Sequence, residues 1–199
     1  MPLSKSVAVG VAGSNAVGLR LFTAVSSIWG IVFGLIGPFY AVYISRISGG
    51  LEKLGFAFSL MVLVQSAASY SIGRYSDKLG RKPFLFMTAL ADSSVLFAFT
   101  VITETYQIYI LQAVLGITNA VGLTIKESML ADLTKREKRG TEIGKFNSVV
   151  SIFAAIGMAV GGLLAEFYGL KYVFYLGSAV ILCSTSLLFF IREPAEEGK

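Results

Sequence analysis

Six apolar stretches, each about twenty residues long and separated by short polar connections, constrain what this chain can fold into. They cover residues 21–44, 54–72, 83–103, 105–125, 146–165 and 172–191. An α-helix rises about 1.5 Å per residue, so each stretch is long enough to cross a hydrocarbon core of roughly 30 Å. Hydrophobic residues make up 55% of the chain and charged residues only 15%, a composition that cannot form a water-soluble surface. We therefore predict an all-α membrane protein with six transmembrane helices.

The positive charges are distributed unevenly between the two sides of such a bundle. Of the 17 Lys and Arg residues, only Arg46, Lys53 and Lys171 fall in the connections on one side. Because cytoplasmic connections carry an excess of Lys and Arg, we expect both termini in the cytoplasm and the protein in the cell (plasma) membrane. The net charge of +5 is therefore explained by the cations of the cytoplasmic connections, and we predict no nucleic-acid partner. The expected segments are a cytoplasmic tail at 1–20, the bundle at 21–192 and a second cytoplasmic tail at 193–199.

Residues that would support catalysis or cofactor binding are scarce. The chain has no histidine, which excludes His-ligated zinc or haem and His-dependent nucleophilic catalysis. Cys183 is the single cysteine and lies in an apolar stretch, so no disulfide framework is predicted. We expect no metal, no cofactor and no enzymatic activity; an intramembrane enzyme is the weakest of the alternatives because no nucleophile–base pattern is present.

The connection between the second and third stretches, residues 73–82, is rich in charge. It reads Gly-Arg-Tyr-Ser-Asp-Lys-Leu-Gly-Arg-Lys, with four cations and one carboxylate. Gly73 and Gly80 suit a tight turn at the membrane surface because glycine tolerates positive φ. We therefore predict a loop that acts as an electrostatic latch between two helices.

The spacing Gly-x3-Asp-[Arg/Lys]-x-Gly-Arg-[Arg/Lys] in this segment resembles the pattern between helices 2 and 3 of the major facilitator superfamily. The matching residues are Gly73, Asp77, Lys78, Gly80, Arg81 and Lys82. After the fourth stretch, Asp132, Arg139-Gly140 and Gly144 resemble the family's Asp…Arg-Gly…Gly run. The resemblance implies that Asp77, Arg81 and Asp132 form a charge cluster that holds the cytoplasmic side closed, with Arg139 part of the same gating motif.

This resemblance implies the N-terminal six-helix half of a transporter that moves a small solute by alternating access, with the substrate bound between two halves. One half lines only one side of such a cavity, so a second six-helix chain or a homodimer is expected beside the membrane lipids and a small-molecule substrate. The alternative is a non-transporting six-span scaffold or partner subunit. An internal signal predicts two inverted three-helix repeats: Gly73, Asp77 and Gly80 recur 89 residues later as Gly162, Glu166 and Gly169.

Polar and aromatic residues within the stretches are candidates for the walls of a substrate cavity. Trp29, Phe33 and Tyr40 share a broad face of the first helix, although ordinary packing explains them equally simply. Gln65 is the one larger polar group in the small-residue part of the second stretch. In the fourth stretch a polar stripe repeats every seven residues and consists of Gln112, Asn119 and Lys126.

Two further features concern the third and fifth stretches. Asp92 lies near the middle of its stretch, where a charged carboxylate is costly, so it is either a proton-coupling group or a hydrogen-bonded structural carboxyl. Gly157, Gly161 and Gly162 predict close helix packing. Their spacing resembles the Gly-Pro-x-x-Gly-Gly signature of proton–drug antiporters, but Met158 replaces the proline, and antiport is therefore not carried over.

Overall fold

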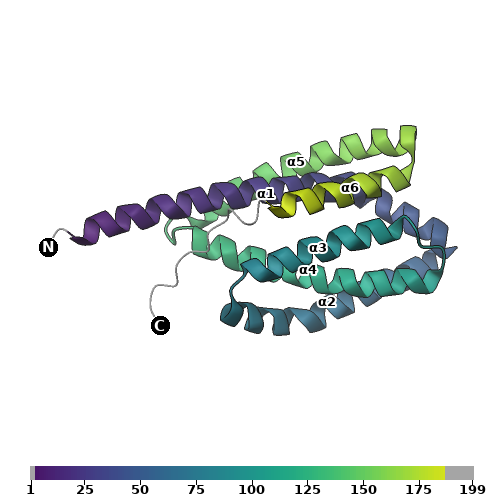
Figure 1. Ribbon diagram of the computed structural model, residues 1–199, viewed down its shortest axis with the longest axis horizontal. Helices are drawn as coiled ribbons and strands as arrows, with labels where there is room; N and C mark the ends of the chain where they lie inside the picture. Colours follow the sequence, from purple (N-terminus) through teal and green to yellow (C-terminus); the bar gives the residue numbers. More distant parts are fainter. Residues whose placement is uncertain (1–2, 187–199) are drawn as a thin grey trace.

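The computed structural model describes residues 3–186, and all the regular structure within them is helical (Figure 1). The six helices run up and down in chain order, as the apolar pattern predicts. They are α1 (Leu3–Ser48), α2 (Leu51–Leu79), α3 (Lys82–Phe99), α4 (Thr105–Leu133), α5 (Arg139–Tyr168) and α6 (Leu170–Thr185).

Length and hydropathy of the described helices agree with a membrane location. The helices α1 to α5 each contain an apolar segment long enough to span a bilayer, and the first of these segments is Val17–Ser48. The described part of α6 is apolar and shorter. The rest of the predicted sixth span, together with the predicted tail at 193–199, lies outside the described residues.

Two helix boundaries differ from the sequence prediction. The first helix begins at Leu3, so residues 3–20, which we expected as a cytoplasmic tail, are helical and continuous with the first apolar stretch. The predicted loop at 73–82 was wrong in extent. Residues 73–79 form the last two turns of α2, and only Gly80 and Arg81 separate α2 from α3.

The physical reason for the second difference is local. Gly73 is helical and faces α4, where an added Cβ would lie 3.6 Å from the Thr124 Cγ2 atom. The chain turns only at Gly80, which has φ 81° and ψ 164°, a conformation that is essentially confined to glycine. Glycine at Gly80 is therefore required by the turn, whereas Gly73 is a packing position.

The helix contacts show the predicted inverted repeat. The main contacts join α1 to α5, α2 to α4 and α3 to α6, and weaker ones join α3 to α4 and α1 to α6. Exchanging the first three helices with the last three converts α1–α5 into α2–α4 and α3–α4 into α1–α6, and it leaves α3–α6 unchanged. Gly169 ends α5 with φ 86° and ψ 158°, which closely matches Gly80 at the end of α2. The two turns lie at opposite ends of the bundle (Figure 1), as an inverted repeat requires.

The backbones of α1 and α5 approach each other closely along one seam. A side chain added at Gly34 would collide with the Ala154 carbonyl, and one at Gly157 or Gly161 with backbone atoms of α1. Gly162 is less restricted, because its added Cβ would lie 3.3 Å from Phe39 Cζ. Small residues permit this approach, which supplies van der Waals contact where lipid provides no hydrophobic drive between helices.

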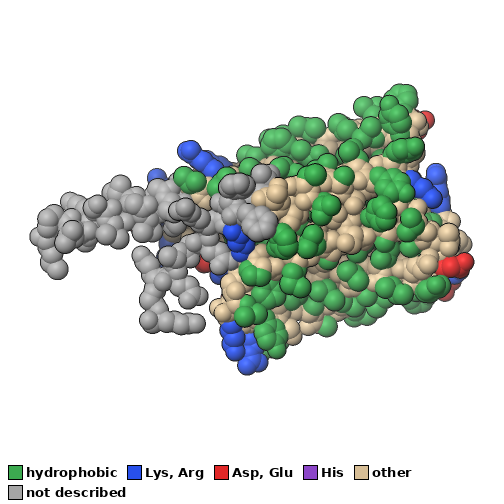
Figure 2. Space-filling model, in the orientation of Figure 1, with side chains coloured by type: hydrophobic (Ala, Val, Ile, Leu, Met, Phe, Trp, Pro, Cys, Tyr) green, Lys and Arg blue, Asp and Glu red, His purple; other side chains and the backbone are tan. Residues whose placement is uncertain are grey.

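Exposed apolar side chains cover the flanks of the bundle, while the cations gather near its two ends (Figure 2). On α2 and α5 the outward residues include Phe56, Leu63, Ile152 and Leu163, each more than half exposed. A surface of this kind is suited to contact with lipid chains. The bundle is thus an integral membrane unit.

Candidate functional site

A cavity of about 390 Å³ lies among α1, α3, α4 and α5. Its aromatic walls are Phe22, Trp29, Phe33 and Phe146. Its polar and charged lining consists of Ser26, Thr88, Asp92, Thr118, Asn119, Lys126, Asn147 and Ser151. Because aromatic, amide, hydroxyl and charged groups converge on one hollow, this cavity is the candidate site for a small organic ligand.

Five residues singled out from the sequence line this cavity. Trp29 and Phe33 come from α1, Asn119 and Lys126 from α4, and Asp92 from α3. The Trp29 indole nitrogen donates to Ser184 Oγ at 3.0 Å, which fixes the ring against α6. The polar stripe of α4 therefore reaches the cavity through two of its three members.

Three other candidates lie outside it. Tyr40 Oη donates to Gln112 Oε1 at 2.9 Å, and Gln112 is completely buried. The Tyr40 ring also packs edge-on against Phe99, with centroids 5.3 Å apart. Gln65 lies half-buried on α2, where its backbone faces Gly116 of α4. The structure thus places Tyr40 and Gln112 in a hydrogen-bonded contact within the bundle, and Gln65 at the seam between α2 and α4.

Several lining residues were not singled out from the sequence. Asn147 and Ser151 are one helical turn apart on α5, and Ser26 is one turn before Trp29 on α1. Their i, i+3 and i, i+4 spacings were the signal that could have revealed them. Thr118, beside Asn119, carried no such signal, because a threonine in a membrane helix commonly bonds its own backbone. Here its hydroxyl donates to Leu115 O at 3.2 Å.

Asp92 is the most unusual group in the lining. Its side chain is 7% exposed, and its Oδ1 atom has no hydrogen-bond partner within the described residues. The Thr118 side chain interacts with the carboxyl group. A buried polar atom without a partner is costly, so a proton or a ligand group in the cavity would stabilise this arrangement.

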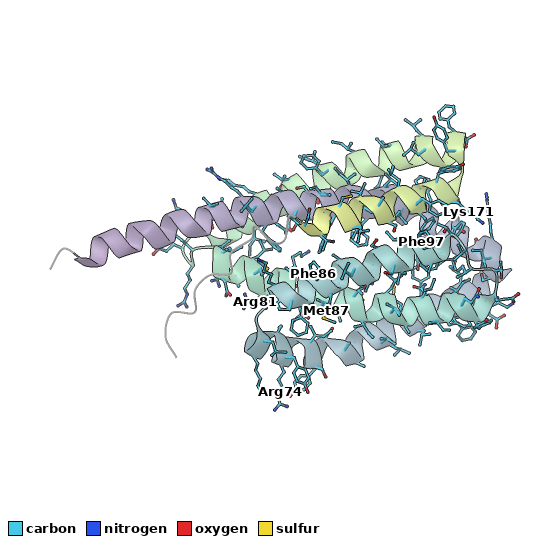
Figure 3. The ribbon with its side chains drawn as sticks, in the orientation of Figure 1. Arg74, Arg81, Phe86, Met87, Phe97 and Lys171 are labelled. Atoms are coloured by element: carbon cyan, nitrogen blue, oxygen red, sulfur yellow. The ribbon has the colours of Figure 1, made fainter. Side chains whose placement is uncertain are left out.

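At one end of the bundle an ion pair joins the α2–α3 turn to the end of α4. Arg81 Nη1 donates to Asp132 Oδ2, and the two side chains are 20% and 44% exposed. Arg139 Nη2 donates to Ala131 O at 2.7 Å and so ties the start of α5 to the same helix end. In Figure 3, Arg81 and Lys171 lie at opposite ends of the bundle. The helices α2, α3, α4 and α5 are therefore fastened to one another at the end that carries Arg81.

The other charged residues of the predicted gating motif are arranged differently. Asp77 and Lys78 are exposed on the last turn of α2, and within residues 3–186 Asp77 forms no ion pair. Lys82 is half-buried at the start of α3. Of the three residues expected to form the cluster, Arg81 and Asp132 form an ion pair, and Asp77 is exposed on the last turn of α2.

Comparison with known proteins bears on this arrangement. A family model described as Major Facilitator Superfamily matches residues 8–199. The chain is 34% identical over 170 residues to "Multidrug resistance protein MdtG" of Rahnella sp. (strain Y9602), a match that covers 82% of this chain and 41% of the relative. The protein of that name from Proteus mirabilis (strain HI4320) is 32% identical over 170 residues, with 82% and 42% covered.

A third relative differs in length. The chain is 27% identical over 157 residues to "Uncharacterized MFS-type transporter YitZ" of Bacillus subtilis (strain 168), covering 79% of this chain and 91% of the relative. The chain thus spans less than half the length of the MdtG relatives and most of the length of YitZ.

Proposed function

Since the chain belongs to the major facilitator superfamily, we propose that it is one six-helix half of a secondary transporter that moves a small solute by alternating access. The observation that carries this proposal is the cavity of about 390 Å³ among α1, α3, α4 and α5. In transporters built from repeats, substrate binds at the interface of the repeats near the middle of the bilayer. A cavity walled by helices from both three-helix repeats fits that position.

The lining favours an amphipathic organic solute. Trp29 and Phe33 offer flat apolar surfaces, while Asn119 and Asn147 offer amide donors and acceptors. Lys126 and Asp92 add one group of each charge. The name of the MdtG relatives, which refers to multidrug resistance, supports the same class of solute. Asp92 is the proposed proton-coupling group, because a proton would stabilise its unpaired buried oxygen.

A second six-helix half completes the transporter. It is either a separate polypeptide or a second copy of this chain, which is permitted when both copies have their termini on the same side. The coverage of YitZ indicates that a relative can be little longer than the matched segment. We place the protein in the cell membrane with both termini in the cytoplasm, on the grounds of the charge distribution.

The gate of this transporter is formed by the end that carries Arg81. The ion pair with Asp132 holds α2, α3 and α4 together, so that these helices move as one body. The exposed carboxylate of Asp77 is left to face the positive N-terminal end of a helix in the second half. In a homodimer that helix would be α5 of the other copy.

The first experiment measures transport by the full chain in proteoliposomes, with ethidium as an amphipathic fluorescent probe. We expect uptake by the wild type and a loss of about tenfold for Asn119→Ala, since one hydrogen bond to a ligand is worth roughly 1–1.5 kcal/mol. Ser66→Ala, an exposed position on α2, is the matched control. If the chain still forms a complex with a second six-helix half but no ethidium uptake is measured, the alternative of a membrane scaffold or partner subunit is favoured.

A second experiment tests the gate without a known substrate. In a Cys183→Ser background, Ser151→Cys places a thiol in the cavity lining. Labelling by a membrane-impermeant thiol reagent from the cytoplasmic side should increase several-fold when Asp77→Asn is added, because the closed interface is weakened. Unchanged labelling would contradict the gating role of Asp77.

The oligomeric state is measured by native mass in a lipid nanodisc. A dimer at about twice the chain mass of 21.3 kDa would support a self-assembled transporter. A monomer would point to a separate second half.

A further inference from the structure

A second, smaller hollow lies between α1 and α5 at the end of the bundle that carries Arg81. Its volume is about 240 Å³. Its lining combines apolar residues with polar and charged ones: Leu19, Phe146 and Val149, together with Thr23, Arg20, Lys145 and Glu142. None of these residues belongs to the gating motif, and only Phe146 also lines the larger cavity.

The two cations of this pocket have no acidic partner within the described residues. Neither Arg20 nor Lys145 forms an ion pair, although Glu142 lines the same pocket. This differs from Arg81 and Arg139, which bind a carboxylate and a backbone carbonyl. Since Glu142 balances one charge, the pocket keeps a net charge of about +1. The guanidinium group of Arg20 and the ammonium group of Lys145 remain as hydrogen-bond donors. Such a pocket is complementary to a phosphate group.

The position of the pocket indicates what carries that phosphate. Arg20 lies near the start of the apolar segment Val17–Ser48, and Lys145 lies less than two turns into α5. With these apolar segments across a bilayer, both positions fall near the membrane–water boundary. Val149, one turn further along α5 than Lys145, is exposed on the flank of the helix. A ligand with a phosphate among the cations therefore has apolar side chains directly beneath it.

We propose that this pocket binds the headgroup of an acidic phospholipid from the cytoplasmic leaflet. Arg20 and Lys145 contact the phosphate, and the first part of an acyl chain lies along Leu19 and Val149. Basic pockets between transmembrane helices on the cytoplasmic side recognise such headgroups, and the cytoplasmic leaflet is rich in anionic lipid. The assignment needs the cytoplasmic orientation of this end but does not depend on transport activity.

One aromatic pair includes the residue that the lipid pocket shares with the larger cavity. The rings of Phe22 and Phe146 stack with centroids 5.5 Å apart and an interplanar angle of 13°. Phe146 contributes to both hollows, while Phe22 lines only the larger one. A lipid in this pocket therefore contacts Phe146, which also lines the larger cavity.

The test counts bound lipids by native mass spectrometry of the full chain in mild detergent, titrated with phosphatidylglycerol or with phosphatidylcholine. We expect phosphatidylglycerol to bind the wild type about 10-fold more tightly. The double variant Arg20→Gln/Lys145→Gln should lose about 10- to 30-fold in affinity for phosphatidylglycerol, since each cation near the surface contributes roughly one kcal/mol.

The matched control is Lys135→Gln/Arg136→Gln, which removes the same charge from exposed residues in the turn between α4 and α5. It should change the affinity for phosphatidylglycerol less than about threefold. Equal losses in the two double variants, or equal binding of the two lipids by the wild type, would overturn the proposal. Displacement of the lipid by millimolar inorganic phosphate would assign the pocket to free phosphate instead. The comparison of the two lipids on the wild type holds even if a variant fails to fold.

Discussion

The α2–α3 turn and the α5–α6 turn have the same backbone and different chemistry. Gly80 and Gly169 adopt nearly the same φ and ψ at equivalent positions of the two repeats. Arg81, after Gly80, pairs with Asp132 on α4. At the other end the position equivalent to Arg81 is Leu170, and the nearest cation, Lys171, is exposed and forms no ion pair within residues 3–186. The turn therefore belongs to the repeated fold, whereas in the part of the chain that the structure describes the ion pair occurs at one end only.

The largest effect is expected when the glycine of each turn is replaced, because the two turns share their backbone conformation. Gly80→Ala and Gly169→Ala should each destabilise the bundle by about 1–3 kcal/mol, because the conformation at these positions is essentially confined to glycine. Thermal unfolding in detergent measures the effect. Gly144→Ala, at a helical and open position, is the control and should be neutral or stabilising. A large effect at only one turn would contradict the equivalence of the repeats.

A smaller effect on stability is expected when the ion pair between Arg81 and Asp132, present at only one of the two turns, is removed. Asp132→Asn should reduce stability by less than about 1 kcal/mol, because the pair with Arg81 is partly exposed. It should nevertheless raise labelling of the cavity cysteine from the cytoplasmic side. Lys171→Gln should change neither quantity. If Lys171→Gln also raised labelling, the ion pair would not be what distinguishes the two ends.

The smallest effect is expected at the helical glycines of the repeat. Gly73→Ala adds a methyl at ordinary contact distance from Thr124, and Gly162→Ala meets Phe39 slightly more tightly. Alanine favours a helix over glycine by about 1 kcal/mol. We therefore expect Gly73→Ala to stabilise the bundle by about 0.3–1 kcal/mol. Gly162→Ala should have an effect near zero. Marked destabilisation by Gly73→Ala would show that its packing is tighter than described.

The sequence was most informative about the fold. Within a bilayer the backbone must satisfy its own hydrogen bonds, so long apolar stretches form helices whatever their neighbours are. The prediction that Gly73 lies in a turn was wrong because glycine occurs in more than one kind of structure. Glycine is compatible with a turn and with a close helix contact, and only the position of Thr124 on another helix decides between them. Gly80, two residues before a proline-containing helix start, was predicted as a turn residue and is one.

The candidate site was only partly predictable. A seven-residue spacing places Gln112, Asn119 and Lys126 on one broad face of α4, but it does not say which neighbour each one meets. Tyr40 of α1 meets Gln112, and this contact between helices has no signature in either sequence segment. Asn147 and Ser151 were missed because polar residues near the beginning of a membrane helix are ordinary at an interface.

Trp29 is the single tryptophan of the chain, and its indole borders the cavity with its nitrogen held by Ser184. When the protein is excited at a wavelength that its nine tyrosines do not absorb, the emission therefore comes from one indole in one known environment. A ligand that displaces water from the cavity would shift that emission to shorter wavelength, and a quencher admitted from one side would report which side is open. The fold thus contains its own optical reporter for ligand entry, with no label attached.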